Sequence, residues 1–257
     1  NRLDSEIILS YILGLPREKI LIDEVNIDEK GINEFNNLIF RRSKNEPIAY
    51  IIKNKEFRST DFFVDKCSLI PRPETELLLD PIVSIFKTKK LFFLDVGIGT
   101  GCIIFSILKE LKNSKGIGID ICKKTIINAT RNLMNFRLNN RAKLLHRSIN
   151  NIHKYKFDLV VSNPPYVITR DINYLPEDIR KFEPRSALDG GNDGLDVIRK
   201  VIYKSKYILK KNGYLALEIG NGQQKKVINL LKDENFRIYK TVKDYRDNIR
   251  CIFSTLL

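Results

Sequence analysis

With 257 residues, of which 43% are hydrophobic and 30% charged, the chain can bury a sizeable core as one or two globular domains. Its apolar stretches are far shorter than a membrane span and no cleavable signal is visible, so we expect no membrane association and a cytoplasmic location. The net charge of +14 would suit nucleic acid or an acidic partner, but the lysines are spread along the chain, and we favour an A/T-biased composition as its cause.

The first part of the chain is expected to form a small helical domain over residues 1–54. Apolar residues recur at helical spacing from Leu3 to Ile12 and again from Ile32 to Ile39. This part is too small to bury a large core of its own. We interpret Tyr11 and Tyr50 as core residues.

A β-hairpin within residues 55–72 is expected to link this domain to the rest of the chain. Phe57 and the apolar residues 62–64 flank four turn residues, which is the pattern of a hairpin. A helix is expected next, from Pro73 to Phe86, because proline suits the first turn of a helix.

From residue 91 onward the pattern becomes strand, turn and helix in alternation, within an expected third domain of residues 73–257. Strands are expected at Leu91–Val96, Gly116–Asp120, Ala142–His146, from Phe157, and at Tyr214–Ile219, Phe236–Val242 and Ile249–Thr255. Helices are expected at Cys102–Leu111, Lys123–Leu138, Leu195–Leu209 and Gln223–Leu231. This alternation predicts a doubly wound α/β domain with a largely parallel sheet.

A glycine-rich loop follows the first strand of this sheet, and an acid ends the second. Glycines let a backbone approach a ligand closely, and Asp120 is placed to accept hydrogen bonds from both hydroxyls of a ribose. The pair indicates a nucleoside-containing cofactor, in preference to a tight turn and an unrelated solvated acid. The loop residues are Gly97, Ile98, Gly99, Thr100 and Gly101.

The strand that begins at Phe157 ends in a second candidate site, Asn163, Pro164, Pro165 and Tyr166. The two prolines stop the strand and keep Asn163 out of helical geometry, which holds its amide rigidly beside an aromatic ring. Asn163 and a free backbone carbonyl can grip both hydrogens of a substrate NH2 group. Taken alone, the motif is explained equally well as a proline-rich turn after a core strand.

Together, the glycine loop, the strand-end acid and N-P-P-Y resemble S-adenosylmethionine-dependent methyltransferases that modify amide or exocyclic amino nitrogens. Further segments extend the resemblance to the HemK/PrmC family of release-factor glutamine N5-methyltransferases, over essentially the whole chain. These segments are Glu46–Tyr50, Leu69–Glu76, Glu183–Leu188, Gly191–Asp196 and Leu217–Gly220. The resemblance implies a Rossmann-like class I methyltransferase sheet, mostly parallel with an antiparallel last strand, and S-adenosylmethionine as cofactor.

The resemblance also implies a substrate and the roles of individual residues. The substrate would be the glutamine of the Gly-Gly-Gln motif of peptide chain release factors, docked with help from the helical domain. The sequence Arg72–Glu76 favours a release factor over a ribosomal protein. Asn163 and the Pro164 carbonyl would accept the two amide N–H bonds and Tyr166 would pack on the amide plane, so catalysis needs mainly positioning and no histidine. The substrate site would comprise Asn163, Pro164, Pro165 and Tyr166, and the cofactor site residues 97–101, Asp120, Ser148 and Asn163.

The chain departs from the family pattern after the third strand of the sheet. The family usually has Asp-Trp there, with the aromatic ring near the adenine, whereas this chain has Arg147 and Ser148. Either the adenine packs more loosely, or Ile149 supplies the apolar surface. Ile98 replaces a common threonine, which should matter little because the loop works through its backbone.

Five other ionisable residues have expected roles. Glu74 and Glu218 either contact the substrate or the cofactor, or have no such contact, with Glu74 capping a helix and Glu218 lying in solvent at a strand end. Asp95 is expected to orient the glycine loop, and His146 and His153 to be structural or surface residues. The four cysteines are scattered without a C-x-x-C pair, so no metal site is expected.

Two other functions remain in competition. A DNA or RNA adenine N6-methyltransferase could use the same clamp, but it must flip its base, and we find no room for a target-recognition domain. Nucleic acid is therefore not expected as a substrate. A protein that binds the cofactor without catalysis is the second alternative, because the Asp-Trp pair is missing.

Overall fold

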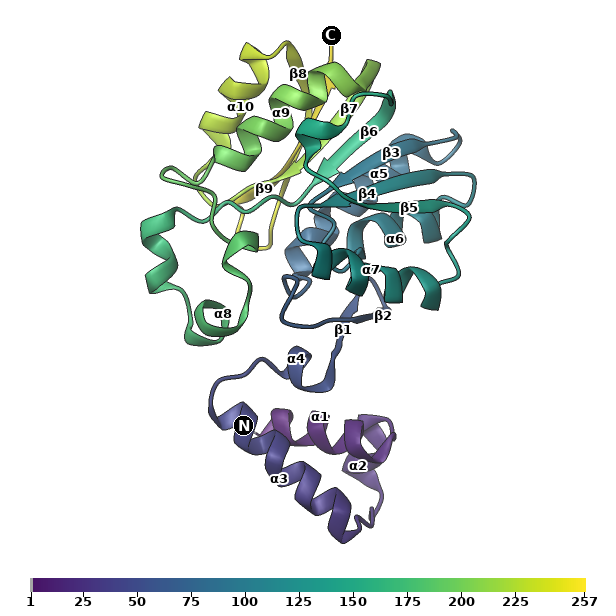
Figure 1. The fold of residues 1–257 in the computed structure, drawn as a ribbon, viewed down its shortest axis with the longest axis vertical. Coiled ribbons are helices and arrows are strands. Elements are labelled where there is room, and N and C mark those ends of the chain that lie inside the picture. The colour runs from purple at the N-terminus through teal and green to yellow at the C-terminus, as the bar shows by residue number, and fades with distance from the viewer. Residues whose placement is uncertain (1) are drawn as a thin grey trace.

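The computed structural model describes residues 2–257, which form a helical N-terminal part and an α/β domain (Figure 1). The helices of the N-terminal part are α1 (Arg2–Leu13), α2 (Arg17–Ile22), α3 (Glu29–Ser43) and α4 (Ile48–Ile52). Ile8, Leu38 and Ile51 form its small buried core. The Asp28 side chain begins α3 by accepting a hydrogen bond from the Gly31 N–H.

The two tyrosines of this part differ in burial. Tyr50 is buried beside Val64 and donates its hydroxyl hydrogen to the Ser68 carbonyl at 2.7 Å, which confirms it as a core residue. Tyr11 is 47% exposed, so its assignment to the core is wrong. Within α1 only Ile8 is buried, because so small a core covers a narrow stripe of the helix.

The expected hairpin is present and packs onto the α/β domain. Strands β1 (Asn54–Phe57) and β2 (Thr60–Phe63) pair antiparallel around residues 58–59, which both have a φ of 51°. Two residues with positive φ give the turn that matches the twist of paired strands. Phe57 and Phe62 are buried in the same core as the helices beneath the main sheet, which fixes the hairpin against that domain.

The helix expected from Pro73 to Phe86 is divided in two. It begins as a 3-10 helix, η1 (Pro73–Leu78), and continues as α5 (Leu79–Phe86). Pro81 has no N–H to donate to the carbonyl four residues earlier, so α-helical bonding cannot run unbroken through this segment. In the first turn of α5 the missing N–H costs little.

The main sheet has seven strands in the order β5-β4-β3-β6-β7-β9-β8. The strands are β3 (Phe92–Val96), β4 (Lys115–Asp120), β5 (Ala142–His146), β6 (Phe157–Ser162), β7 (Leu209–Glu218), β8 (Phe236–Lys243) and β9 (Ile249–Leu256). The pairs from β5 to β7 are parallel, whereas β9 runs antiparallel to both β7 and β8. The expected mostly parallel sheet with an antiparallel last strand is thus confirmed.

Helices cover both faces of this sheet (Figure 1). One core contains residues of α5, α6 (Cys102–Glu110) and α7 (Lys123–Asn135), and the other contains residues of α9 (Asp196–Ile208) and α10 (Gln224–Asp233). No helix within residues 2–257 is both long and apolar enough to cross a membrane.

No helix was predicted for the segment between β6 and α9. It contains η3 (Thr169–Tyr174), α8 (Glu177–Phe182) and η4 (Arg185–Ala187). Glu183, whose side chain is 1% exposed, pairs with Arg72 and accepts a hydrogen bond from the Ile70 N–H. This buried ion pair holds the segment against the stretch that precedes η1.

Candidate active site

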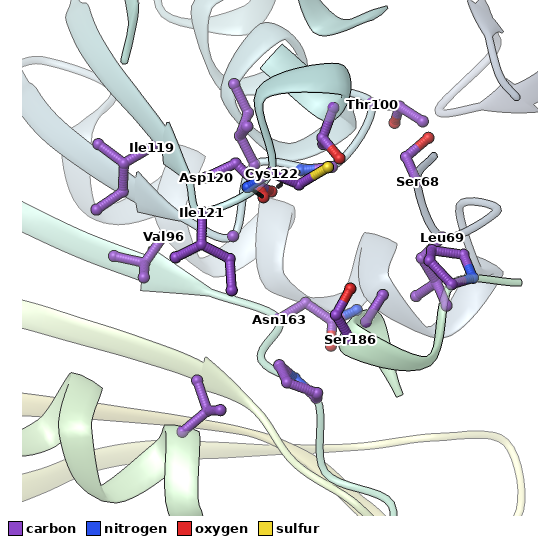
Figure 2. Close-up of a pocket in the computed structure, with 18 of the residues that line it drawn as sticks. Ser68, Leu69, Val96, Thr100, Ile119, Asp120, Ile121, Cys122, Asn163 and Ser186 are labelled. Atoms are coloured by element: carbon purple, nitrogen blue, oxygen red, sulfur yellow. Dashed lines mark hydrogen bonds between the residues drawn. The ribbon is translucent and has the colours of Figure 1, made fainter. Parts of the chain in front are cut away.

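A pocket of about 270 Å³ opens where β3, β4 and β6 end. Because these strands are parallel, their carboxyl ends meet at one edge of the sheet, where ligands of α/β domains bind. Figure 2 shows Asp120, from the end of β4, and Asn163, which follows β6, on different sides of this pocket. The structure therefore brings together the two motifs that the sequence indicated.

The glycine loop after β3 lies against the pocket with its backbone. Gly97 and Gly99 have positive φ values of 74° and 54°, and a Cβ added at either would have no atom within 4 Å. These two positions leave open space for a ligand close to the backbone. Ile98 points the other way, because a Cβ on Gly118 of β4 would lie 2.3 Å from the Ile98 side chain. The Ile98 side chain is thus accommodated by a glycine of β4, while Ile98 also lines the pocket.

Asp120 is held by backbone N–H groups. Its Oδ1 accepts a hydrogen bond from the Cys122 N–H at 2.9 Å, and its Oδ2 accepts one from the Gly99 N–H at 3.3 Å. Burial raises the pKa of Asp120, and these backbone bonds act in the opposite direction. Each carboxylate oxygen keeps a free lone pair, so the fixed group can accept further hydrogen bonds from a ligand.

Apolar side chains line the pocket beyond Asp120. Ile121 is 67% exposed and lines the pocket, and Ile149 lines it while being largely buried in the core. Ser148 also lines the pocket, and its Oγ caps the short helix η2 (Ile149–Asn151) by accepting from the Asn150 N–H. Ile121 was missed in the sequence, although its place directly after the strand-end acid was a signal.

Two of the remaining ionisable groups bond to the backbone near the pocket. Asp95 is fully buried and its Oδ2 accepts a hydrogen bond from the Ile104 N–H in the first turn of α6, so its expected role in orienting the glycine loop stays a prediction. His146 forms a hydrogen bond at 2.9 Å with the carbonyl of Ile121, which agrees with the structural or surface role expected for it.

The N-P-P-Y motif lies between two cavities. Asn163 and Pro165 line the pocket described above, whereas Asn163, Pro164 and Tyr166 line a second cavity of about 160 Å³. Asn163 is thus shared by both, together with Leu69, Arg72 and Ala187. A group bound in one cavity would meet a group bound in the other at Asn163.

Buried polar groups hold the motif in place. The Asn163 Nδ2 donates to Thr75 Oγ1 at 3.0 Å, and Thr75 Oγ1 donates to Glu218 Oε2 at 2.7 Å. The Tyr166 hydroxyl donates to Glu218 Oε1 at 3.2 Å and accepts from Arg250 Nη2 at 3.2 Å.

Glu218 is completely buried, so the alternative of a solvated strand-end acid is wrong for this residue. Glu74 is exposed in the first turn of η1. Within residues 2–257, no cluster of three or more His, Cys, Asp or Glu side chains is placed to hold a metal ion. The roles of Thr75 and Arg250 could not be found by reading the sequence, because their partners lie 88 and 84 positions away along the chain.

The fold and the sequence place the protein in a known class. A family profile described as a methyltransferase domain matches residues 87–251. A methyltransferase from Pyrococcus furiosus shares the fold with a TM-score of 0.56 and 19% identity, covering 86% of this chain and 98% of that one. Magnesium protoporphyrin IX methyltransferase from Synechocystis PCC 6803 gives a TM-score of 0.53 and 16% identity, covering 91% and 100%. The protein is a methyltransferase of the class I fold.

Its family follows from similarity along the whole chain. Release factor glutamine methyltransferase of Caulobacter vibrioides is 36% identical over 253 residues, which are 97% of this chain and 88% of that protein. The same enzyme of Buchnera aphidicola is 39% identical over 250 residues, covering 97% and 90%. A profile described as the PrmC N-terminal domain matches residues 1–52. The chain belongs to the release factor glutamine methyltransferase family, which confirms the resemblance found in the sequence.

Proposed function

We propose that this protein transfers a methyl group from S-adenosylmethionine to the side-chain amide nitrogen of the glutamine in the Gly-Gly-Gln motif of peptide chain release factors. The observation that carries the proposal is the position of Asn163 between two adjoining cavities. One cavity suits the cofactor and the other suits a glutamine side chain, so donor and acceptor meet at the residue that can bind an amide.

The residues of the larger pocket fit S-adenosylmethionine. The open cradle at Gly97 and Gly99 lets the cofactor lie against the loop of residues 97–101, and Asp120 accepts the ribose hydroxyls. Ile121 and Ile149 supply the apolar surface for the adenine in place of the usual aromatic ring, with Ser148 at the edge of that site. The bound cofactor supplies a methyl group that its sulfonium has already activated.

The residues around the smaller cavity position the substrate amide. A glutamine nitrogen is a poor nucleophile because its lone pair is delocalised, so orientation has to do most of the work. The Asn163 Oδ1 and the Pro164 carbonyl accept the two amide N–H bonds, and Pro165 stiffens the turn. Holding the nitrogen in line with the methyl group can lower the barrier by roughly 7 to 11 kcal/mol.

Tyr166 completes the clamp with its ring. The Arg250 guanidinium lies over this ring at 5.6 Å from its centroid, and Tyr166 also lines the smaller cavity, where the substrate amide would pack on it. The two carbonyl acceptors stabilise positive charge that develops on the attacking nitrogen. After transfer, the protonated amide loses its proton to water, so no histidine is needed.

The protein substrate is expected to dock on the helical N-terminal domain beside the smaller cavity. Asn45 of this domain donates a hydrogen bond to Glu177 of α8, so the domain adjoins the segment that lines that cavity. A release factor that spans both parts can insert its Gly-Gly-Gln loop between them. Nucleic acid is not expected as a substrate, and the cytoplasm, where release factors act, is the expected location.

A transfer assay with labelled S-adenosylmethionine tests the proposal. We expect label on a wild-type release factor, none on its Gly-Gly-Ala variant, and none on duplex DNA. Label on DNA would replace the proposal with the adenine alternative. Cofactor binding without transfer to any substrate would support the binding-only alternative.

A further inference from the structure

A buried chain of hydrogen bonds connects the substrate clamp to Arg250. It runs from Asn163 through Thr75 to Glu218, and from Glu218 through the Tyr166 hydroxyl to Arg250, with every donor–acceptor distance between 2.7 and 3.2 Å. Thr75 is 2% exposed and Glu218 is fully buried. Buried polar groups that are hydrogen-bonded to one another restrict each other's orientation.

The direction of each bond in this chain follows from the hydrogens available. Arg250 can only donate, so the Tyr166 hydroxyl accepts from it and gives its single hydrogen to Glu218. As a carboxylate Glu218 can only accept, so Thr75 likewise gives its single hydrogen to the other oxygen of Glu218. The Thr75 oxygen is then able only to accept, and the partner it accepts from is the Asn163 NH2 group.

This direction decides which end of the Asn163 amide the substrate meets. With its NH2 group turned toward Thr75, Asn163 presents Oδ1, an acceptor, to the space shared by the two cavities. The reverse orientation would put an NH2 donor opposite the NH2 group of the substrate, and two donors cannot form a hydrogen bond. The orientation of one side chain therefore separates a productive clamp from an unproductive one.

We propose that Thr75 and Glu218 are positioning residues that lock the Asn163 amide with its oxygen toward the substrate nitrogen. Arg250 and Tyr166 support them: burial raises the pKa of Glu218, whereas Arg250, 4.0 Å away, and the Tyr166 hydroxyl favour its charged form. This inference rests on the proposed function, since it assumes that Asn163 binds the substrate amide. Thr75, the threonine of the segment Arg72–Glu76, then serves to orient Asn163.

Two substitutions at Thr75 test the inference. Thr75→Val keeps the shape of the side chain and removes the hydroxyl, so Asn163 loses the partner that orients it. We expect kcat for release-factor methylation to fall about 10-fold or more, with the cofactor Kd within about twofold of wild type. Thr75→Ser keeps the hydroxyl and should restore kcat to within about threefold. Wild-type kcat in Thr75→Val, or an equal loss in Thr75→Ser, would overturn the inference.

A matched control and a direct readout separate orientation from folding. Thr130→Val removes a hydroxyl that bonds only to the Ile126 carbonyl within α7, and it should leave kcat unchanged. Should Thr75→Val not fold, Thr75→Ala removes the same hydroxyl with less bulk. Hydrogen exchange of the Asn163 side-chain amide, followed by NMR without substrate, should be slow in wild type and fast in the Thr75 variants. Equal exchange rates in the wild type and the Thr75 variants would refute the locking of Asn163, whether or not the protein methylates a release factor.

Discussion

Asn163 and Asp120 divide the two binding tasks of the site between them. Asn163 belongs to both cavities and has one amide end free for a substrate, whereas Asp120 is fixed by the backbone N–H groups of Gly99 and Cys122. Each residue therefore has the partners that its proposed role requires. Both were predicted from the sequence, because each stands at a strand end with a motif around it.

Alanine substitutions should separate these roles. Asn163→Ala removes an acceptor aimed at the reacting nitrogen and should lower kcat/KM for the release factor about 100-fold or more, with little effect on cofactor affinity. Asp120→Ala removes two hydrogen bonds to the ribose and should weaken cofactor binding about 10-fold or more. Isothermal titration with S-adenosylmethionine and a transfer assay measure the two effects. Equal loss of cofactor affinity in both variants would refute the division.

The contacts among other residues of the site could not be predicted from the sequence, for a physical reason. Thr75, Glu218 and Arg250 meet only because η1, β7 and β9 pack together, and no local pattern records such a contact. Glu218 shows the difficulty, since a carboxylate at a strand end is ordinarily solvated but here lies under η1. Tyr11 shows the converse, because helical periodicity indicates an apolar face but not how much of it is covered.

At the scale of elements, the alternating pattern predicted the strands and helices of the sheet well. Strands buried on both faces are near-continuous apolar runs. A glycine, a proline or an acid lies at or just after the ends of β3, β4, β6 and β7. The pattern fails where tertiary contacts shape the backbone. The segment of η3, α8 and η4 consists of short helices, and the pair between Arg72 and Glu183 helps to fix its position.

The junction of β3 and α6 should depend on pH through Asp95. Burial raises the pKa of Asp95 to about 7, from an ordinary value of 3.8. The folded protein then binds this proton more tightly than the unfolded chain, so the stabilisation is present below about pH 4 and is lost as the pH rises through 7. An asparagine side chain does not ionise, so Asp95→Asn should not lose stability over this pH range.

Urea unfolding at pH 5 and pH 8 measures the effect. We expect the wild type to lose stability from pH 5 to pH 8 and Asp95→Asn not to lose it. The free energy of unfolding of the variant minus that of the wild type should therefore increase by on the order of a few kcal/mol. The exposed residue Asp61 provides a control, since Asp61→Asn should show no such rise. The same difference from wild type at both pH values would show that Asp95 does not titrate in this range.

The segment between β6 and α9 should loosen when its buried ion pair is broken. Arg72→Ala leaves the Glu183 carboxylate buried without its partner, which should destabilise the protein by about 3 kcal/mol. Hydrogen exchange in residues 169–187 should accelerate more than elsewhere. Arg170→Ala, which breaks an exposed pair with Asp171, should change the stability by less than about 0.5 kcal/mol. If Arg72→Ala also changed the stability by less than about 0.5 kcal/mol, the role of the ion pair in holding this segment would be contradicted.

At the scale of the whole molecule, the helical domain and the segment around α8 lie at the same side of the α/β domain (Figure 1). Under the proposed function, a docked release factor would contact both of these parts. The net charge of +14 requires no nucleic-acid site, because lysines are distributed along the chain. At physiological salt, the general attraction of positive side chains to phosphates is screened beyond a distance of about 8 Å.

Competition with DNA tests this view of the charge. Excess duplex DNA at about 0.15 M salt should slow release-factor methylation less than about twofold, because non-specific phosphate contacts weaken steeply with salt. The control is the same reaction at low salt, where some inhibition is expected. Strong inhibition that persists at high salt would indicate a specific nucleic-acid site.

The most direct test of the whole account is to locate the transferred methyl group. A release factor is incubated with this protein and S-adenosylmethionine, and the peptide with the Gly-Gly-Gln motif is sequenced by tandem mass spectrometry. We expect a single methyl group on the side chain of that glutamine, and none when Asn163→Ala replaces the wild-type protein. A methyl group on any other residue, or an unmodified glutamine after complete reaction, would contradict the account.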